Sequence, residues 1–199
     1  MVECVLWDFG DTLADESWMN KAPYQLPSWP NLYKQLIWEG QLGIDWNLGK
    51  LQTEDIVSHF AGLLSVDRGH IADHMKRCCE DVKFFDHAMK AVQSCELPQA
   101  IVTINPDIFS QCVVPNYRLD QLFEPIVTSW QERTLDKSDL CDKALQQLGG
   151  VLDRSGALLI DNRIENVESW RSRGGIAYLF TGNEAFASEP PDLFKNFLD

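Results

Sequence analysis

The chain has few basic residues for its number of acidic ones. Among its 199 residues, 17 Lys and Arg stand against 30 Asp and Glu, a formal net charge of −13 at pH 7. A surface of this sign repels a phosphate backbone unless its few cations gather on one face, so we expect no nucleic-acid partner. No window approaches the roughly 18 consecutive apolar residues of a membrane span, and no basic stretch followed by a long apolar run opens the sequence. We therefore expect a soluble, cytoplasmic protein with no membrane partner.

The chain also lacks a clear disulfide framework, an internal repeat and a low-complexity tract. Of its six cysteines, Cys78 and Cys79 are adjacent. The other four lie in apolar, periodic segments: Cys4, Cys95, Cys112 and Cys141. This pattern favours reduced, buried thiols over bridges. With 45% hydrophobic and 24% charged residues, the chain should form one sizeable core and a modest second unit.

Five short apolar runs predict buried β-strands. They cover residues 2–7, 100–103, 125–128, 157–161 and 175–179. Because the runs are apolar throughout and do not alternate, both faces of each strand should be covered, as in a parallel sheet. Helical patterns lie between several of these runs, and Asp86 and Ser138 are candidate N-caps for two of the helices. The alternation of strand and helix predicts an α/β fold with a doubly wound parallel sheet.

Residues 14–83 interrupt this alternation. Their first part contains Pro23, Pro27 and Pro30, which oppose regular helix. A short helix that ends near Gly40 and a second helix capped by Thr53 would follow. A third helix would bury Ile71, Met75 and Cys79. We interpret 14–83 as a small α-helical cap inserted after the first strand. The α/β core would then comprise residues 1–13 and 84–199.

Two groups of side chains in this segment have simple structural explanations. His70, His74 and Cys78 are spaced four apart, but eight residues of helix span about 12 Å, too far for a tetrahedral metal site. We expect a solvated stripe or an interface there. Four tryptophans also crowd the segment: Trp18, Trp29, Trp38 and Trp46. Core packing is the default for them, and a wall against a ring-containing substrate is the alternative.

Polar side chains stand where the predicted strands end. Asp8 follows the first strand, Thr103 ends the second, and Asp161 and Asn162 end the fourth. Lys137 comes just before the helix that leads to the fourth strand. Ligands of open parallel sheets bind beyond the carboxyl ends of the strands, so these residues are the first candidates for a site. Taken singly, each has a plainer explanation as a turn, strand or surface residue.

Four motifs in order resemble those of the haloacid dehalogenase (HAD) superfamily. They are WDFGDTL (7–13), AIVTIN (100–105), DKSD (136–139) and LLIDNRIENV (158–167). The segments YRLDQLFEPIVTSW (117–130) and LGKLQTEDI (48–56) are also similar to parts of HAD hydrolases with a helical cap. The resemblance covers nearly the whole core, and it implies a HAD-like Rossmannoid core, the helical cap and a hydrolase activity.

The resemblance also implies roles for individual residues. Asp8 looks like the nucleophile that forms an aspartyl-phosphate. Thr103 would donate its hydroxyl to a phosphoryl oxygen, and Lys137 would place its charge against the phosphate and Asp8. Asn105 would join them in binding the substrate. The reacting centre would thus combine a carboxylate, a hydroxyl and an ammonium group.

A magnesium ion is the cofactor that the resemblance implies. Its ligands would be the carboxylate of Asp8, the backbone carbonyl of Gly10 and a residue of the last motif, either Asp161 or Asn162. If Asn162 is the direct ligand, its amide oxygen brings no negative charge and the affinity should fall. Asn166 is a second neutral residue at a position that is often acidic in the family.

The largest departure from the family pattern is Gly10. Phosphatases of the family commonly carry an aspartate there, which protonates the leaving group and then activates water. Glycine has no proton to transfer. Either Asp11 substitutes for the missing group, or the substrate or solvent supplies the proton, or turnover is slow.

These observations give one leading function and two alternatives. The leading function is a magnesium-dependent phosphatase of a small phosphate ester that works through an aspartyl-phosphate. Gly10 and Asn162 motivate an alternative, a HAD-like binding or regulatory protein that recognises a phosphorylated ligand without turnover. The weakest is a haloacid dehalogenase, because relatives of that kind carry a tyrosine where this chain has Gly10 and the sequence shows no clear halide-binding arginine.

Overall fold

The computed structural model describes residues 1–21, 26–149 and 153–197, and in them one parallel sheet of five strands. The strands are β1 (Cys4–Trp7), β2 (Gln99–Thr103), β3 (Ile126–Thr128), β4 (Ala157–Asp161) and β5 (Ile176–Leu179). Their order is β3-β2-β1-β4-β5, so β1 is the central strand. In the register, Trp7 pairs with Ile101 of β2 and with Ile160 of β4. The predicted fold class is confirmed, and each strand lies within two residues of its predicted range.

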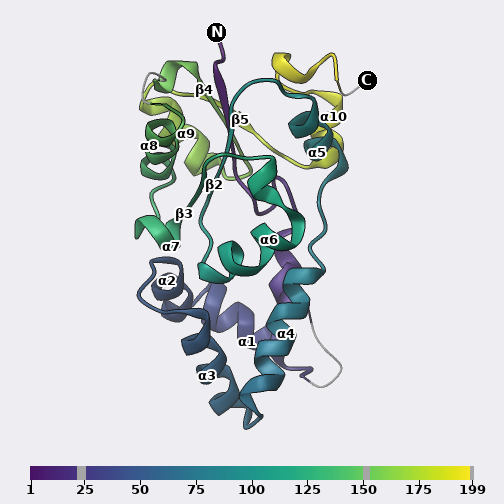
Figure 1. The fold of residues 1–199 in the computed structure, drawn as a ribbon, viewed down its shortest axis with the longest axis vertical. Helices are drawn as coiled ribbons and strands as arrows, with labels where there is room; N and C mark the ends of the chain where they lie inside the picture. The colour runs from purple at the N-terminus through teal and green to yellow at the C-terminus, as the bar shows by residue number, and fades with distance from the viewer. Residues whose placement is uncertain (22–25, 150–152, 198–199) are drawn as a thin grey trace.

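Both faces of the sheet are covered, which explains why the strands are apolar throughout. Leu6 of β1 belongs to a buried cluster with Leu140 of one helix and Trp170 of another, on one face. The neighbouring Val5 and Trp7 belong to the cluster on the opposite face. Successive side chains of a strand point to opposite faces, so an apolar run satisfies both clusters at once. In Figure 1, α8 and α9 lie together on one side of the sheet, and α5 and α10 lie on the other.

Helices connect the strands of the core. The α-helices are α5 (Asp86–Ser94), α6 (Val114–Tyr117), α7 (Ser129–Glu132), α8 (Lys137–Gln147), α9 (Ile164–Ser172) and α10 (Asn183–Ser188). A π-helical turn, η3 (Phe109–Val113), and short 3₁₀ turns complete the set: η4 (Leu119–Gln121), η5 (Arg154–Gly156) and η6 (Asp192–Phe194). Helix α8 packs on β2 and β3, whereas α9 packs on β4 and β5.

A helical insertion, residues 16–80, separates β1 from β2. Its elements are η1 (Glu16–Asn20), α1 (Trp29–Tyr33), η2 (Lys34–Trp38), α2 (Gln41–Asn47), α3 (Thr53–Leu64) and α4 (Arg68–Glu80). Helices α1 to α4 gather at the end of the molecule away from both termini (Figure 1). Helix α2 begins directly after Gly40. The sequence predicted that a helix ends near Gly40, but it did not predict this next helix. The division of the chain into a core and a cap domain stays a prediction, and Pro23 lies outside the described residues.

Three predicted helix caps are wrong. Asp136 caps α8, because its Oδ1 reaches the backbone N–H groups of Ser138 and Asp139 at 2.9 and 3.1 Å. Asp86 is the first residue of α5 and makes no side-chain cap. Thr53 opens α3 in the same way, behind the N-cap Gln52. In each case the true cap precedes the predicted residue by one or two positions, because a residue that is already helical cannot turn its side chain onto the orphan N–H groups.

For His70, His74 and Cys78 on α4 we expected a solvated stripe or an interface, and the solvated stripe is wrong for two of the three. His74 and Cys78 are buried, with the Cys78 Sγ 3.6 Å from His74 Nε2, and the His74 ring packs edge-on against Trp29. Burial lowers the pKa of His74 to about 4, so the ring is neutral at pH 7. All six cysteines are free, four of them buried, as expected. None of the helices in the described ranges is long and apolar enough to cross a membrane.

Candidate active site

A cavity of about 670 Å³ lies beyond the carboxyl ends of β1 and β2. Asp8, Thr103 and Lys137 line its polar part. The helical insertion contributes Ile37, Trp38 and Ile44 to another part of the wall, and Leu135 of the core adds to that apolar surface. The cavity therefore lies between the strand ends and the insertion, where ligands of open α/β sheets bind.

Asp8 is positioned by the pairing of the two central strands. It follows directly after β1, and its backbone N–H donates to the carbonyl of Ile160 in β4 at 2.9 Å. Its carboxylate is buried and still lines the cavity. The Nζ of Lys137 lies 2.6 Å from Asp8 Oδ1. A buried carboxylate held against an ammonium group is suited to nucleophilic attack on an anionic ester.

The ammonium group of Lys137 joins the ends of three neighbouring strands. Besides Asp8, it donates to the carbonyl oxygen of Val102 in β2 at 2.9 Å and lies 3.1 Å from Asp161 Oδ2 in β4. An ammonium group carries three N–H donors, so these three acceptors satisfy it. Its side chain is 2% exposed, so solvent does not screen these contacts.

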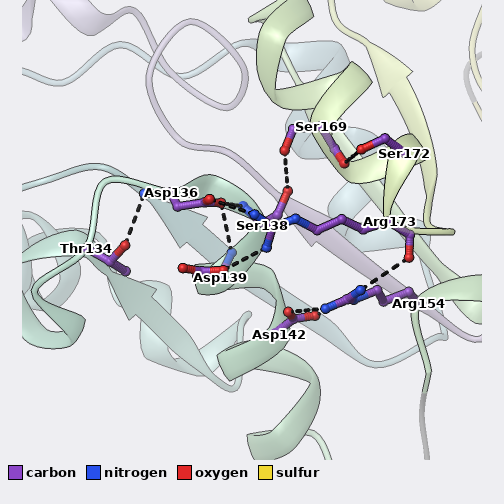
Figure 2. A network of polar contacts seen from close by, with 9 residues as sticks. All are labelled: Thr134, Asp136, Ser138, Asp139, Asp142, Arg154, Ser169, Ser172 and Arg173. Atoms are coloured by element: carbon purple, nitrogen blue, oxygen red, sulfur yellow. Dashed lines mark hydrogen bonds and ion pairs between the residues drawn. The ribbon is translucent and has the colours of Figure 1, made fainter.

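A polar network fixes the start of α8, where this lysine stands (Figure 2). Asp136 caps the helix, and its other oxygen contacts Arg173 Nη2 at 2.7 Å. The second arm of Arg173 contacts Asp139 in the first turn, also at 2.7 Å. Ser138 and Ser169 share a hydroxyl contact of 2.9 Å, which ties α8 to α9. The first turn of α8 is thus bonded to Ser169 of α9 and to Arg173, the residue directly after α9. These contacts fix the backbone from which the Lys137 side chain extends into the cavity.

Thr103 and Asn105 form the β2 side of the cavity. Thr103 is the last residue of β2 and is buried, and its Oγ1 accepts a hydrogen bond of 2.8 Å from Asn105 Nδ2. Both side chains line the cavity with Asp8 and Lys137. The structure therefore brings together the four residues that were predicted to react with or bind the substrate, and their roles stay predictions.

Burial and charge act in opposite directions on this cluster. Burial raises the pKa of Asp8 to about 6, against the opposing effect of the Lys137 ammonium group. Burial works against the charge of Lys137 as well, but Asp8 and Asp161 outweigh it and hold the pKa of the lysine above its ordinary value. The lysine therefore stays protonated at neutral pH, and Asp8 is mostly ionised there.

Solved structures share this architecture, although no protein-family model and no curated protein matches the chain. An L-2-haloacid dehalogenase from Xanthobacter autotrophicus is 19% identical over 95% of this chain and 82% of its own, with a TM-score of 0.68. A predicted HAD-like family hydrolase from Porphyromonas gingivalis is 13% identical over 90% and 91%, with a TM-score of 0.69. A HAD family enzyme from Bacteroides thetaiotaomicron, in complex with magnesium and inorganic phosphate, is 14% identical over 90% and 94%, with a TM-score of 0.67.

The chain has the HAD superfamily fold. Identities of 13 to 19% show the fold alone, so the shared architecture does not carry the neighbours' activities to this chain. The HAD fold accounts for the place of the cavity at the carboxyl edge of the sheet. What the cavity does has to be argued from its own residues.

The candidate magnesium ligands implied by the HAD resemblance do not surround a common space here. Asp8 and Gly10 line the cavity, whereas Asp161 is fully buried behind it. Asp161 Oδ1 accepts from the Arg163 backbone N–H at 2.8 Å and from Asn166 Nδ2 at 3.0 Å. Its Oδ2 contacts the same Asn166 nitrogen at 3.0 Å and the buried ammonium group. Both oxygens are therefore committed to protein donors.

Asn162 does not complete such a shell either. Its Oδ1 is buried and has no hydrogen-bond partner among the described residues, and the side chain does not line the cavity. The described residues contain no group of three or more His, Cys, Asp or Glu that could hold a metal ion. Mg²⁺ demands near-ideal octahedral oxygen geometry, so this arrangement does not fit it.

Asp11, one of the three alternatives considered for the acid missing at Gly10, directs its carboxylate toward the residues that follow it in the chain. Its backbone φ of 51° is left-handed, and its Oδ1 accepts from the backbone N–H of Glu16 at 2.9 Å. The carboxylate thus binds the first backbone N–H of η1, and Asp11 still lines the cavity.

Among the cavity residues that sequence reasoning did not single out are Glu16 and Arg163, whereas a substrate wall was the alternative that it gave for Trp38. Glu16 and Arg163 contact each other at 3.9 Å across the cavity wall, although they are far apart in sequence. Trp38 was considered only as one of four tryptophans, and its 46% exposure distinguishes it from the buried Trp18, Trp29 and Trp46. The signal for Arg163 was its place in the last motif, directly after the strand-end residues.

Proposed function

We propose that this protein is a hydrolase that transfers the phosphoryl group of a phosphate monoester to Asp8 and then to water. One observation carries the proposal. The Nζ of Lys137 lies 2.6 Å from the Asp8 carboxylate in a cavity that Thr103 also lines. A nucleophile, a fixed positive charge and a hydroxyl donor are the groups that phosphoryl transfer to a carboxylate requires.

The reaction is written in two displacements. In the first, an oxygen of Asp8 bonds to phosphorus, the bond from phosphorus to the ester oxygen breaks, and the leaving alcohol takes up a proton. In the second, water attacks phosphorus, the bond to Asp8 breaks, and inorganic phosphate leaves with the carboxylate restored. Lys137 neutralises charge in both steps, and the Thr103 hydroxyl donates to a phosphoryl oxygen.

The cavity favours an ester with an apolar body. Ile37, Trp38 and Ile44 from the insertion and Leu135 from the core form an apolar wall beside the polar residues. Trp38 and Ile44 are 46% and 42% exposed. Exposing large apolar side chains to water is unfavourable in free energy, so contact with an apolar ligand would stabilise them. A cavity of about 670 Å³ is also larger than a phosphate group needs. Apolar walls with a few converging polar groups are typical of small-molecule sites.

Magnesium is no part of the steps proposed here, because Asp161 and Asn162 are not arranged to bind it. The neighbour that holds magnesium and phosphate shows what one protein of this fold binds, at 14% identity. For this chain, the charge of Lys137 supports phosphoryl transfer by itself.

The test is release of phosphate from an activated aryl phosphate such as 2,4-dinitrophenyl phosphate. We expect wild-type turnover and a loss of at least about a thousandfold in the Asp8→Asn variant. Asp45→Asn makes the same chemical change in α2, where the carboxylate pairs with Lys50 outside the cavity, and should retain wild-type activity. Turnover that survives Asp8→Asn overturns the proposal. Phosphate binding without any turnover supports the binding protein in its place.

Carbon–halogen hydrolysis is a second candidate, favoured by one observation. Arg163 lines the cavity with an exposed guanidinium group, a cation that could receive halide. A neighbour of this fold is a haloacid dehalogenase solved with chloropropionic acid covalently bound. In that reaction an Asp8 oxygen bonds to carbon as halide leaves, and water then attacks the ester. Chloride release from 2-chloropropionate, lost in Asp8→Asn, with no phosphate release from any ester, would select this function.

A further inference from the structure

A carboxyl group stands over Gly10. A Cβ built on this glycine would lie 3.2 Å from both Cγ and Cδ of Glu16 and 3.4 Å from its Cβ. Real Cβ contacts are rarely so close, so the Glu16 side chain fills the space that a side chain at position 10 would use. Glu16 also lines the cavity that holds Asp8, and Asp8 is two residues before Gly10. The chain therefore carries a carboxyl group at this place, supplied from η1.

The chemistry proposed above needs such a group. When the bond from phosphorus to an alkyl oxygen breaks, the alkoxide that forms is a strong base, and a positioned acid lowers the barrier by protonating it. In the second displacement the attacking water has to lose a proton. One carboxyl group can serve both steps, because it is ionised after the first.

Four carboxyl groups line the cavity, and three of them have other tasks. Asp8 is held by the buried lysine. Asp15 accepts from the backbone N–H of Ser17 at 2.8 Å as the N-cap of η1, and hydrogen bonding from the Ser17 hydroxyl, with a smaller effect of this N–H, lowers its pKa. Asp11 accepts from the backbone N–H of Glu16. Glu16 itself has one charged partner among the described residues, Arg163, at the long distance of 3.9 Å.

We propose that Glu16 is the general acid that protonates the leaving oxygen and the general base that then takes a proton from the attacking water. The proposal rests on the hydrolase function proposed above. In the first step the Glu16 proton moves to the ester oxygen as its bond to phosphorus breaks. In the second step a proton of water moves to the Glu16 carboxylate as the water oxygen bonds to phosphorus and Asp8 is released.

The surroundings of Glu16 are consistent with this role. Burial raises the pKa of its carboxyl group, and the Arg163 guanidinium opposes that rise. The charged groups that act on it come from the loop after β1, from β4, from the residue before α9 and from α8: Asp11, Asp161, Arg163 and Lys137. A raised pKa lets the group hold a proton closer to neutral pH than a solvated glutamate does.

The experiment compares two esters that differ in their need for a proton. 2,4-Dinitrophenyl phosphate releases a stable phenolate, whereas 2-phenylethyl phosphate releases an alkoxide. In Glu16→Gln we expect kcat/KM for the alkyl ester to fall by about 10²–10⁴-fold and that for the activated ester to change only a few-fold. The alkaline limb of the alkyl pH profile should disappear. Gly10→Asp combined with Glu16→Ala should restore part of the alkyl activity that Glu16→Ala alone loses, since the truncation frees the space into which the new carboxyl group is placed.

Controls separate this inference from the function on which it rests. Glu54→Gln makes the same change at an exposed position of α3 that pairs with Arg68, and it should leave both esters unaffected. An equal loss for both esters in Glu16→Gln, no loss for either, or an alkyl-specific loss in Asp11→Asn that is absent from Glu16→Gln overturns the role of Glu16. If Asp8→Asn still cleaves the activated ester, the hydrolase proposal itself fails, and the role of Glu16 falls with it.

Discussion

Lys137 holds two buried carboxylates in place at once. Its Nζ lies 2.6 Å from Asp8 and 3.1 Å from Asp161, and all three side chains are shielded from solvent. A buried charge is tolerated only when it is paired, so the two aspartates depend on this lysine. Lys137 therefore affects both the stability of the carboxyl ends of β1 and β4 and the charge of the cavity.

Replacing Lys137 by methionine should leave Asp8 and Asp161 without their cation. We expect the free energy of unfolding to fall by about 3–5 kcal/mol and Asp8-dependent hydrolysis to be lost. Urea denaturation and the activated-ester assay measure the two effects. Lys143→Met, in the same helix but half-exposed, should change neither by much. Equal stability of the two variants would contradict the assignment of Lys137 as the buried counter-ion.

The pKa of Asp8 predicts the acid side of the pH profile. Burial raises this pKa to about 6, and only the ionised carboxylate attacks phosphorus. As pH falls through about 6 the carboxylate is protonated, so kcat/KM for 2,4-dinitrophenyl phosphate should decline tenfold per pH unit below that point. The activated ester is the suitable probe because it needs no general acid. A rate that stays constant down to the ordinary aspartate range would show that burial does not govern Asp8.

At the level of elements, the insertion is attached to the core through Asp107. This buried side chain follows β2, and it accepts from Trp46 Nε1 of α2 at 2.7 Å. It also accepts from the backbone N–H and hydroxyl of Thr53, at the start of α3, at 3.0 and 2.7 Å. One carboxylate from the core thus satisfies three donors of two helices in the insertion. The predicted capping role of Thr53 is wrong because its hydroxyl bonds to Asp107.

Asp107→Ala should therefore loosen α2 and α3. Three buried or half-buried donors would lose their acceptor, and we expect a loss of about 2–4 kcal/mol in the free energy of unfolding. Hydrogen exchange should report faster opening in α2 and α3 than in the sheet. Thr53→Ala removes a single donor and should cost less than half as much. Identical exchange of the insertion in wild type and Asp107→Ala would contradict this attachment.

Elements were easier to anticipate than their ends. The strand runs and the amphipathic pattern of α4 are local, and both are found where predicted: Ile71, Met75 and Cys79 are buried together. Helix α2 was missed because its seven residues are held by partners distant in sequence, such as Asp107 with Trp46. The burial of His74 beneath Trp29 also depends on a contact between separate elements.

At the scale of the whole molecule, the cavity is formed by two parts of the chain. The strand ends supply Asp8 and Thr103, and the insertion supplies Trp38. Trp38→Ala should raise KM for 2-phenylethyl phosphate about tenfold with little change in kcat, since the ring offers about 1.5 kcal/mol or more of apolar contact to substrate and transition state alike. Leu63→Ala, an exposed apolar residue of α3 outside the cavity, is the matched control. A KM effect of equal size for glycerol phosphate would contradict an apolar wall.

Removal of divalent metal tests the electrostatics of the assembled site. Because Lys137 supplies the positive charge and Asp161 is committed to protein donors, we expect hydrolysis of the activated ester in EDTA to stay within a few-fold of that in magnesium. Calorimetric titration with magnesium should show no tight binding. Complete loss in EDTA with recovery on adding magnesium would mean that Asp161 leaves its contacts with Arg163 and Asn166 to bind the ion.

The sequence by itself determined the layers of this protein and pointed to three residues of its cavity. Apolar runs predicted strands covered on both faces, and Asp8 and Thr103 stand where two of these strands end. Lys137 was identified through the resemblance of its motif to that of the HAD superfamily. Only the tertiary structure decided which groups complete the site. Glu16 fills the space over Gly10, Asp161 is bound by Arg163 and Asn166, and the insertion closes the cavity with Trp38. These contacts join segments distant in sequence, and their geometry is set by the packing of whole elements.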